Sequence, residues 1–218
     1  MEPKLSQEKI IETAFQLLQE TPNLEKLSMR NIAKKIGVQA PALYWYFQNK
    51  QALLQSMAET IESQFQEPTQ QSDWKQTLFQ YMENYYDLYQ QIPCALQIEL
   101  HTIPSSPARL LHHNNMLGIL RDAGFSVEAS FTALSSLRHL LFGLLVDAHE
   151  EQQINNKITE GDQYLTQQVV LMRQYVQEQQ LNHVAESFTY RQQENQRDAF
   201  RKMIRFFLNS LAQEQQEQ

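Results

Sequence analysis

The chain has 218 residues, enough for one large or two small domains, and 42% of them are hydrophobic, which allows a substantial core. Five glycines and seven prolines leave few breaks, so the composition predicts an all-α fold. A single cysteine, Cys94, excludes an internal disulfide framework and fits a reducing cytoplasm. The polar N-terminus predicts no signal peptide, and no apolar run approaches the roughly 18 residues of a membrane span. We therefore expect a cytoplasmic protein without a membrane segment.

The first fifty residues predict a compact set of short helices. Ser6 is a good N-cap for a helix that ends before Thr21-Pro22-Asn23. A second helix, capped by Ser28, stops at Gly37, because glycine enters the left-handed C-terminal position without a Cβ clash. A third covers residues 41–47 and begins at Pro41, where the missing N–H costs nothing. Two short helices that pivot on a glycine form a helix-turn-helix, whose second helix enters the DNA major groove.

Charge supports a DNA contact in this region. Residues 26–50 contain no acid and five cations: Lys26, Arg30, Lys34, Lys35 and Lys50. The chain carries a net charge of −7, but residues 1–50 hold seven positive and five negative side chains. A locally basic face on an acidic protein suits phosphate contact. The alternative is a solvated helical hairpin, but Tyr44, Trp45 and Tyr46, expected on the open side, favour DNA binding.

The fourth helix links this head to the rest of the chain. It is expected to begin after the N-cap Asn49 and to end at Glu67-Pro68. The polar run 68–72 is the best domain boundary. We therefore divide the chain into residues 1–67, a helix-turn-helix domain that includes the linking helix, and residues 68–218, a helical domain for ligand binding and dimerisation.

The second domain predicts one helix after another. They cover residues 74–91, a short segment 93–102, and residues 108–122, 127 to about 151, 164–180 and 198–212. Residues 152–163 are expected to be loose, and residues 181–195 are ambiguous. The helix 127–151 is apolar nearly all round and must be buried on several sides; Gly143 in it is tolerable where another backbone approaches closely. The two long apolar helices predict a homodimer seam, with an internal core as the alternative.

Catalytic motifs are missing from the sequence. The glycines at 37, 118, 124, 143 and 161 form neither a GxGxxG motif nor a P-loop, and there is no HExxH. No glutamate precedes a histidine by three residues, so the helical di-iron signature is missing too. His112 and His113 are neighbours on a helix and do not face the same way. We expect no enzyme, cofactor or metal site; an all-α metalloenzyme is the alternative of another class.

Two motifs carry a resemblance to a known family. GVQAPALYWY at residues 37–46 and NKQALL at residues 49–54 resemble the DNA-binding head of the tetracycline-repressor (TetR) family, and the likeness covers residues 5–60. It implies that Arg30 reads bases and that Lys50 contacts the backbone. With phosphate anchors and the recognition helix, the expected DNA-binding residues are Arg30, Lys34, Ala40, Pro41, Ala42, Tyr44, Trp45, Tyr46 and Lys50. Ala40 and Ala42 replace polar residues and Tyr46 replaces a histidine, so we expect an operator different from the tet operator.

The resemblance extends into the second domain. Residues 101–104, 123–128 and 133–143 resemble the ligand-binding body of the tetracycline-responsive members. The resemblance places these residues at or near ligand-contacting positions: Tyr81, Tyr85, Glu99, Thr102, Pro104, His139 and Asp147. His112 and Met116 match only with an inserted residue, but with Arg109 they share one helix face at i, i+3 and i+7. Tyr81 and Tyr85 could equally be core, and His139 a satisfied core histidine.

The replacements shape the expected ligand. Glu99 stands where the resemblance puts the histidine that holds drug-bound magnesium, Ile103 replaces an arginine, and Tyr81 replaces an amide that grips the drug. We therefore expect that Mg–tetracycline is not the natural effector. The aromatic and methionine lining favours a flat apolar or amphipathic molecule, and Glu99 could attract a cationic one.

The resulting prediction is a ligand-responsive transcriptional repressor that binds a palindromic operator as a homodimer and is released by a small molecule. A DNA-binding regulator without a ligand, or an activator, remains open. The sequence does not identify the effector, the operator, the regulated gene or a metal that accompanies the ligand.

Overall fold

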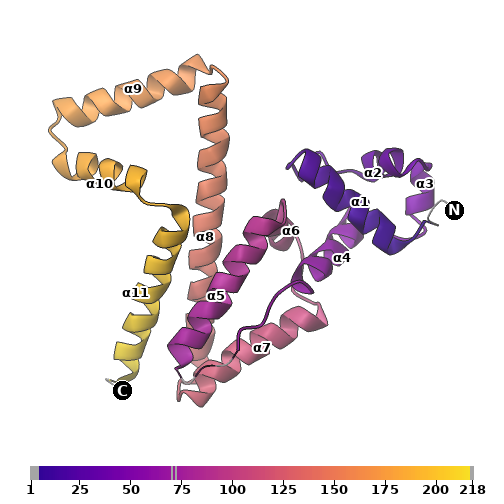
Figure 1. The fold of residues 1–218 in the computed structure, drawn as a ribbon, viewed down its shortest axis with the longest axis horizontal. Coiled ribbons are helices and arrows are strands. Elements are labelled where there is room, and N and C mark those ends of the chain that lie inside the picture. The colour runs from indigo at the N-terminus through magenta and orange to yellow at the C-terminus, as the bar shows by residue number, and fades with distance from the viewer. Residues whose placement is uncertain (1–4, 70, 72, 217–218) are drawn as a thin grey trace. The chain divides into compact units, whose positions relative to one another are not determined.

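The computed structural model describes residues 5–69, 71 and 73–216, so parts of the predicted N-terminal arm and of the run 68–72 lie outside the described residues. Eleven helices and no strand make up the regular structure of this described part, which confirms the all-α fold (Figure 1). The chain forms two compact units, residues 1–134 and 135–218. The division of function after Glu67 stays a prediction.

Seven helices and the start of an eighth form the first unit: α1 (Gln7–Glu20), α2 (Met29–Ile36), α3 (Ala40–Leu43), α4 (Lys50–Glu62), α5 (Trp74–Gln91), α6 (Ala95–Leu100), α7 (Pro107–Asp122) and α8 (Val127–Thr159). The second unit holds the rest of α8 with α9 (Gln163–Glu178), α10 (Asn182–Gln193) and α11 (Gln196–Gln216).

The head, α1 to α4, forms where the local signals placed it. The side chains of Ser6, Ser28 and Asn49 accept hydrogen bonds from the first turns of α1, α2 and α4, as their residue types predicted. α1 packs on α2 and α4, and α2 on α3. Its core consists of side chains that are fully buried: Ile10, Leu18, Ile32, Leu43, Leu53 and Met57.

Several predicted helix lengths were wrong. The recognition helix ends at Leu43 rather than at residue 47, and residues 44–46 form a turn. α4 ends at Glu62 rather than near Glu67, where the Ser63 hydroxyl donates to the Thr60 carbonyl (2.8 Å) and competes with helix continuation. α8 runs to Thr159 through the stretch expected to be loose, because no breaker intervenes before Gly161, whose φ is 98°. The ambiguous segment contains α10.

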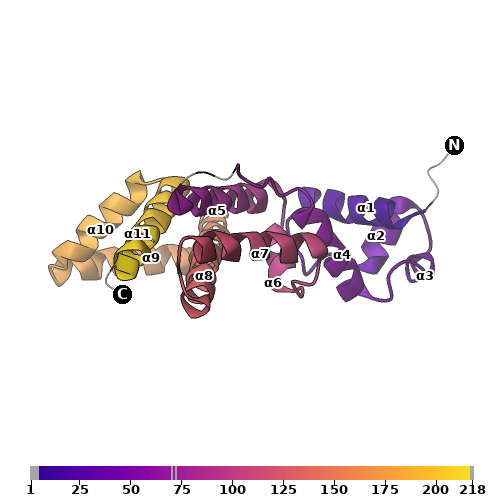
Figure 2. The same cartoon turned by 90° about the horizontal axis from the view of Figure 1, so that it is seen from below.

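The last helix of the head is attached to the following helices within the first unit. α4 packs on α6 and α7, and α5 packs on the same two helices (Figures 1 and 2). The Gln51 amide donates to the His101 carbonyl (2.7 Å), and the Gln55 side chain donates to the Ile103 carbonyl (2.7 Å) and accepts from its N–H (3.1 Å). These bonds tie α4 to the α6–α7 loop, so the head and the body segment share one compact unit.

The second unit leaves much apolar surface exposed. α11 buries Phe200, Ile204 and Leu208, one turn apart, whereas α9 and α10 bury no side chain among the described residues. In α8, Gly143 is exposed, and a Cβ there would meet nothing within 4 Å. The close backbone approach expected at Gly143 is therefore not made by any described residue of this chain.

α8 is also long and apolar enough to cross a membrane, by length and composition alone. The expectation that no run approaches that length was therefore wrong. In its most apolar window 39% of the residues are buried. Core helices of soluble proteins pass the same test, so this observation alone is weak evidence for a membrane segment.

Gly37 gives a direct test of the helix-turn-helix. Its φ of 87° ends α2 in the left-handed region, and a Cβ there would meet nothing within 4 Å. We expect Gly37→Ala to lower the free energy of unfolding by about 1–2 kcal/mol through backbone strain alone. The matched control is Gly118→Ala in α7, which also meets nothing within 4 Å and should stabilise the chain by up to about 1 kcal/mol. Equal effects in denaturant titrations would contradict the assignment.

Candidate functional site

The helix-turn-helix presents cations and aromatic rings to solvent. Arg30 and Lys34 on α2 are exposed. In the turn after α3, Tyr44 is 52% and Trp45 90% exposed, an unusually high exposure for a tryptophan side chain. On α3, Pro41 is exposed and its alanine neighbours are half-buried. Guanidinium and ammonium groups beside exposed rings can contact phosphates and base edges.

Two predicted DNA-binding side chains turn inward instead. The Tyr46 hydroxyl donates to the Leu5 carbonyl (2.7 Å), which attaches the recognition turn to the start of the chain. Lys50 Nζ donates to the Leu24 carbonyl (2.8 Å), and burial lowers the pKa of its ammonium, although Glu25 opposes that shift. Both side chains stabilise the head in this structure, so their predicted contacts with DNA stay untested.

A buried carboxylate joins the head to the body. Glu62, the last residue of α4, is 1% exposed. Its Oε1 accepts hydrogen bonds from the Tyr85 hydroxyl of α5 (2.7 Å) and from His112 Nδ1 of α7 (2.7 Å). Its Oε2 is buried and has no hydrogen-bond partner among the described residues. One oxygen thus connects three helices, while the other is left to accept a further donor.

Glu67 adds a second carboxylate to the same cluster. Its Oε1 accepts from Asn115 (2.7 Å) and from the Tyr81 hydroxyl (3.3 Å), and lies 3.9 Å from His112 Nε2. Phe65, between the two glutamates, stacks on Tyr85 with ring centroids 4.1 Å apart. We call these residues the Glu62 cluster: Glu62, Phe65, Glu67, Tyr81, Tyr85, His112 and Asn115.

Glu99 and Arg109 form an ion pair beside this cluster. Glu99 of α6 is buried, and the Arg109 guanidinium of α7 contacts its carboxylate. Because Arg109 already balances Glu99, this glutamate is a poorer anchor for a cationic ligand than the sequence suggested. Among the described residues Glu62 pairs with no arginine or lysine, and its buried Oε2 has no hydrogen-bond partner, so it is the better anchor.

The two tyrosines of the cluster are held protonated. Burial raises the pKa of Tyr81 to about 12, and the charge of Glu67 adds to the shift. Burial raises the pKa of Tyr85 well above its ordinary value, with Glu62 contributing. Both phenols therefore act as hydrogen-bond donors to carboxylates at neutral pH. Across the described residues, no three His, Cys, Asp or Glu side chains are grouped to hold a metal.

Comparison with known proteins identifies the family. The family of bacterial regulatory proteins named tetR matches residues 10–57, and the tetracyclin repressor-like C-terminal domain matches residues 67–213. The chain belongs to the TetR family. The class C tetracycline repressor of Escherichia coli is 33% identical over 168 residues, which cover 75% of this chain and 74% of that protein.

Solved TetR-family structures share the fold. A possible TetR family transcriptional regulator from Streptomyces coelicolor A3(2) matches with a TM-score of 0.77 at 25% identity, over 95% of this chain and 98% of that one. The S. coelicolor TetR family protein ActR, in complex with actinorhodin, matches with a TM-score of 0.76 at 18% identity, over 96% and 97% of the two chains. The predicted family and its helix-turn-helix are thereby confirmed.

The structure brings together half of the ligand residues predicted from the TetR resemblance and the shared helix face. Those that meet in or beside the Glu62 cluster are Tyr81, Tyr85, Glu99, Arg109 and His112. The Thr102 hydroxyl donates to the Ile98 carbonyl (3.0 Å), Pro104 is exposed, and Met116 is half-buried. His139 and Asp147 belong to the second unit and are exposed. The ligand-contacting role of all ten stays a prediction.

Sequence reasoning missed Glu62, Phe65, Glu67 and Asn115. A signal for Glu62 was present, because it continues the buried row Leu54, Ala58 at a spacing of four residues along α4. A carboxylate on a buried helix face needs a partner, and this need points to a site.

The raised tyrosine pKa values predict a specific alkaline behaviour. Above pH 10 the unfolded chain ionises these phenols while the folded cluster keeps them protonated, so the stability they contribute is lost as pH rises towards 12. Tyr81→Phe and Tyr85→Phe should flatten this loss and remove late-titrating phenols from the absorbance titration at 295 nm. Tyr44→Phe, an exposed control, should change neither. A wild-type titration complete by pH 10.5 would contradict the burial.

Proposed function

We propose that this TetR-family protein is a ligand-responsive transcriptional repressor that acts in the cytoplasm, binds a palindromic DNA operator as a homodimer, and is released by a small molecule. The observation that carries the proposal is the position of Glu62. It ends the last helix of the DNA-binding head, yet its partners Tyr85 and His112 lie on α5 and α7. A molecule that competes for this carboxylate acts directly on the head.

The chemistry of the Glu62 cluster indicates the effector class. Three rings, Phe65, Tyr81 and Tyr85, lie within stacking distance, with centroid separations of 5.8 and 4.1 Å from Phe65. Among the described residues, the buried Oε2 of Glu62 has no hydrogen-bond donor, and Glu67 adds a second carboxylate. A flat aromatic or amphipathic molecule with a cationic or donor group suits this combination. ActR, which shares the fold, is known in complex with actinorhodin.

Mg–tetracycline is a poor fit for the same site. Glu99 is already paired with Arg109, and across the described residues no group of three metal-ligating side chains forms. The class C tetracycline repressor is about one third identical to this chain over the matched region. We therefore propose an effector other than Mg–tetracycline.

Release from DNA follows from differential binding. The Glu62–His112 and Glu62–Tyr85 bonds favour the present position of α4. A ligand that pairs with Glu62 more strongly when α4 has shifted stabilises the shifted state, and only this difference in affinity moves the equilibrium. The exposed apolar side chains of α9, such as Val170 and Leu171, support a second copy covering the second unit.

DNA binding divides between two exposed cations. Arg30→Ala should cost about 1–3 kcal/mol on the operator and reduce the preference over random DNA, because Arg30 is proposed to read a base. Lys34→Ala should lower the affinity for operator and for random DNA alike, and lower the slope of log affinity against log salt by about one. Lys35→Ala is the control, since Lys35 pairs with Glu20 (2.5 Å). The measurement is fluorescence anisotropy of DNA binding at several salt concentrations. If the Arg30 and Lys34 variants each lose the same affinity for operator and for random DNA, the two residues do not have these separate roles.

The effector site is tested with Glu62→Gln. A thermal-shift screen covers flat aromatic molecules with and without a cationic group, and tetracycline with and without magnesium. A ligand at 100 times its dissociation constant adds about 2.7 kcal/mol of stability. Glu62→Gln should weaken a cationic hit at least about tenfold, because a bond to a charged group contributes roughly 1.5–3 kcal/mol.

The matched control is Glu59→Gln, an exposed carboxylate on the same helix, which should leave the hit unchanged. A hit that also releases operator DNA supports the repressor. If no compound shifts the thermal unfolding transition, the ligand-responsive repressor is replaced by a DNA-binding regulator without a ligand. If Mg–tetracycline is the strongest hit, the proposed effector class is overturned.

A further inference from the structure

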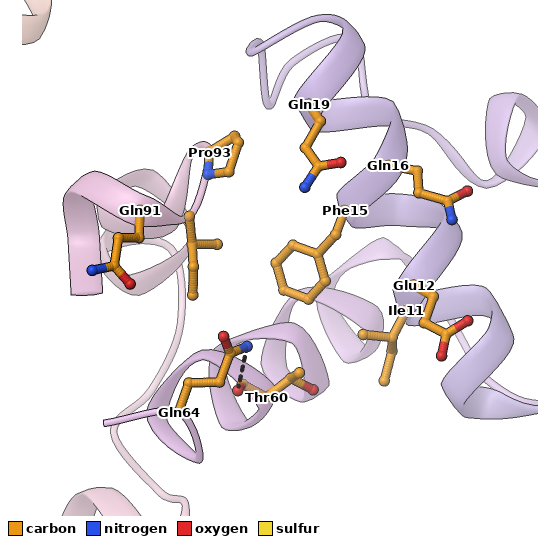
Figure 3. A pocket seen from close by; sticks show the side chains of 10 residues that line it. Ile11, Glu12, Phe15, Gln16, Gln19, Thr60, Gln64, Gln91 and Pro93 are labelled. Carbon is orange, nitrogen blue, oxygen red and sulfur yellow. Dashed lines mark hydrogen bonds between the residues drawn. The ribbon is translucent and has the colours of Figure 1, made fainter. Parts of the chain in front are cut away.

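A cavity lies within the first unit, between α1, the end of α4 and the turn that joins α5 to α6 (Figure 3). Its volume is about 580 Å³, within the roughly 300–1,000 Å³ typical of small-molecule sites. We call it the junction cavity. It shares no lining residue with the Glu62 cluster: its walls are formed by Ile11, Glu12, Phe15, Gln16, Gln19, Thr60, Gln64, Gln91, Ile92 and Pro93.

The walls of the junction cavity suit a flat ring. The half-buried Phe15 ring points from α1 into the space, and Pro93 and Gln91 lie across from it (Figure 3). The wall opposite Phe15 contains Pro93, whose ring restricts its own φ. An aromatic side chain facing a rigid apolar wall accommodates a planar molecule by stacking.

Carboxamides supply the polar part of the lining. Gln16, Gln19, Gln64 and Gln91 come from three different segments. Among the lining residues one hydrogen bond is drawn, from the Gln64 amide to the Thr60 carbonyl (3.3 Å), so the other three carboxamides are not bonded to a lining residue. A carboxamide offers donors and an acceptor in one plane, which matches the adjacent donor and acceptor atoms on the edge of a purine.

Charge selects against phosphate. Glu12 is the only ionisable side chain in the lining, and no lysine or arginine belongs to it. Lys9 approaches Glu12 at 3.9 Å, but it is not part of the wall. An anionic ligand would meet a carboxylate without a cation to balance its own charge.

We propose that the junction cavity binds a neutral purine-type ring, as a nucleobase or nucleoside without phosphate. The bound ring bridges α1 of the head and the end of α5, and contacts Thr60 of α4 and Gln64 in the turn that follows α4. It therefore opposes movement of α4 relative to α1. Its effect on DNA rests on the repressor proposed above, whereas its binding does not.

The test is calorimetric titration of the full-length chain, without DNA, by adenosine and guanosine, with AMP as the charged counterpart. We expect saturable binding of one nucleoside per chain and at least tenfold weaker binding of AMP. Gln19→Ala and Gln91→Ala should each weaken the nucleoside several-fold, while Gln90→Ala, an exposed neighbour outside the lining, should not. Glu12→Gln should reduce the difference in affinity between AMP and adenosine.

The outcomes separate cleanly. The proposed site is overturned if neither nucleoside binds, if AMP binds as tightly as the nucleoside, or if neither glutamine variant changes the affinity for the nucleoside. Saturable binding of a disaccharide in place of the nucleosides also overturns it. Operator affinity is then measured with the tightest nucleoside. A change that Gln91→Ala abolishes supports a regulatory site, and unchanged operator affinity overturns the regulatory part. Because binding is read without DNA, failure of the repressor proposal gives a different result.

Discussion

The buried carboxylate of Glu62 constrains the arrangement of the first unit. An unpaired charge of this kind is costly in an interior, so its partners must be held in place. Tyr85 and His112 meet that need at 2.7 Å each, and both come from helices beyond the DNA-binding head. Packing alone would tolerate small sliding of α4, but two directed hydrogen bonds on one oxygen fix its end. The position of the head therefore depends on the hydrogen-bond partners of one side chain.

Local signals accounted for most of the head. Ser6, Ser28, Asn49 and Gly37 each acted as their residue types dictate, because capping and left-handed backbone are decided within one turn of helix. What failed was also local: α4 stops at Glu62 where Ser63 bonds back to the preceding turn, and α8 continues through a polar segment that contains no breaker. Polarity alone did not predict a loop.

Only half of the candidate site could be predicted from the sequence, for a different reason. Tyr81, Tyr85 and His112 stood out as residue types, but their partners Glu62 and Glu67 lie up to 50 residues away, beyond any periodic pattern. The same limit applies to Tyr46 and Lys50. Both side chains carry groups that suit a contact with DNA, but they donate hydrogen bonds to the carbonyls of Leu5 and Leu24, which are 41 and 26 residues away in the sequence. Residue type predicts what a group can bond, while the fold decides which partner it finds.

α4 contributes residues to both the Glu62 cluster and the junction cavity. Glu62, its last residue, faces Tyr85 and His112, while Thr60, two residues earlier, lines the junction cavity. Residues two apart on a helix point in different directions, so two molecules could contact α4 without touching each other. If both influence its position, their effects cannot be independent, because each alters the equilibrium that the other senses, and the coupling must be equal in both directions. A single short helix would then suffice to combine two chemical signals, without any contact between the sites.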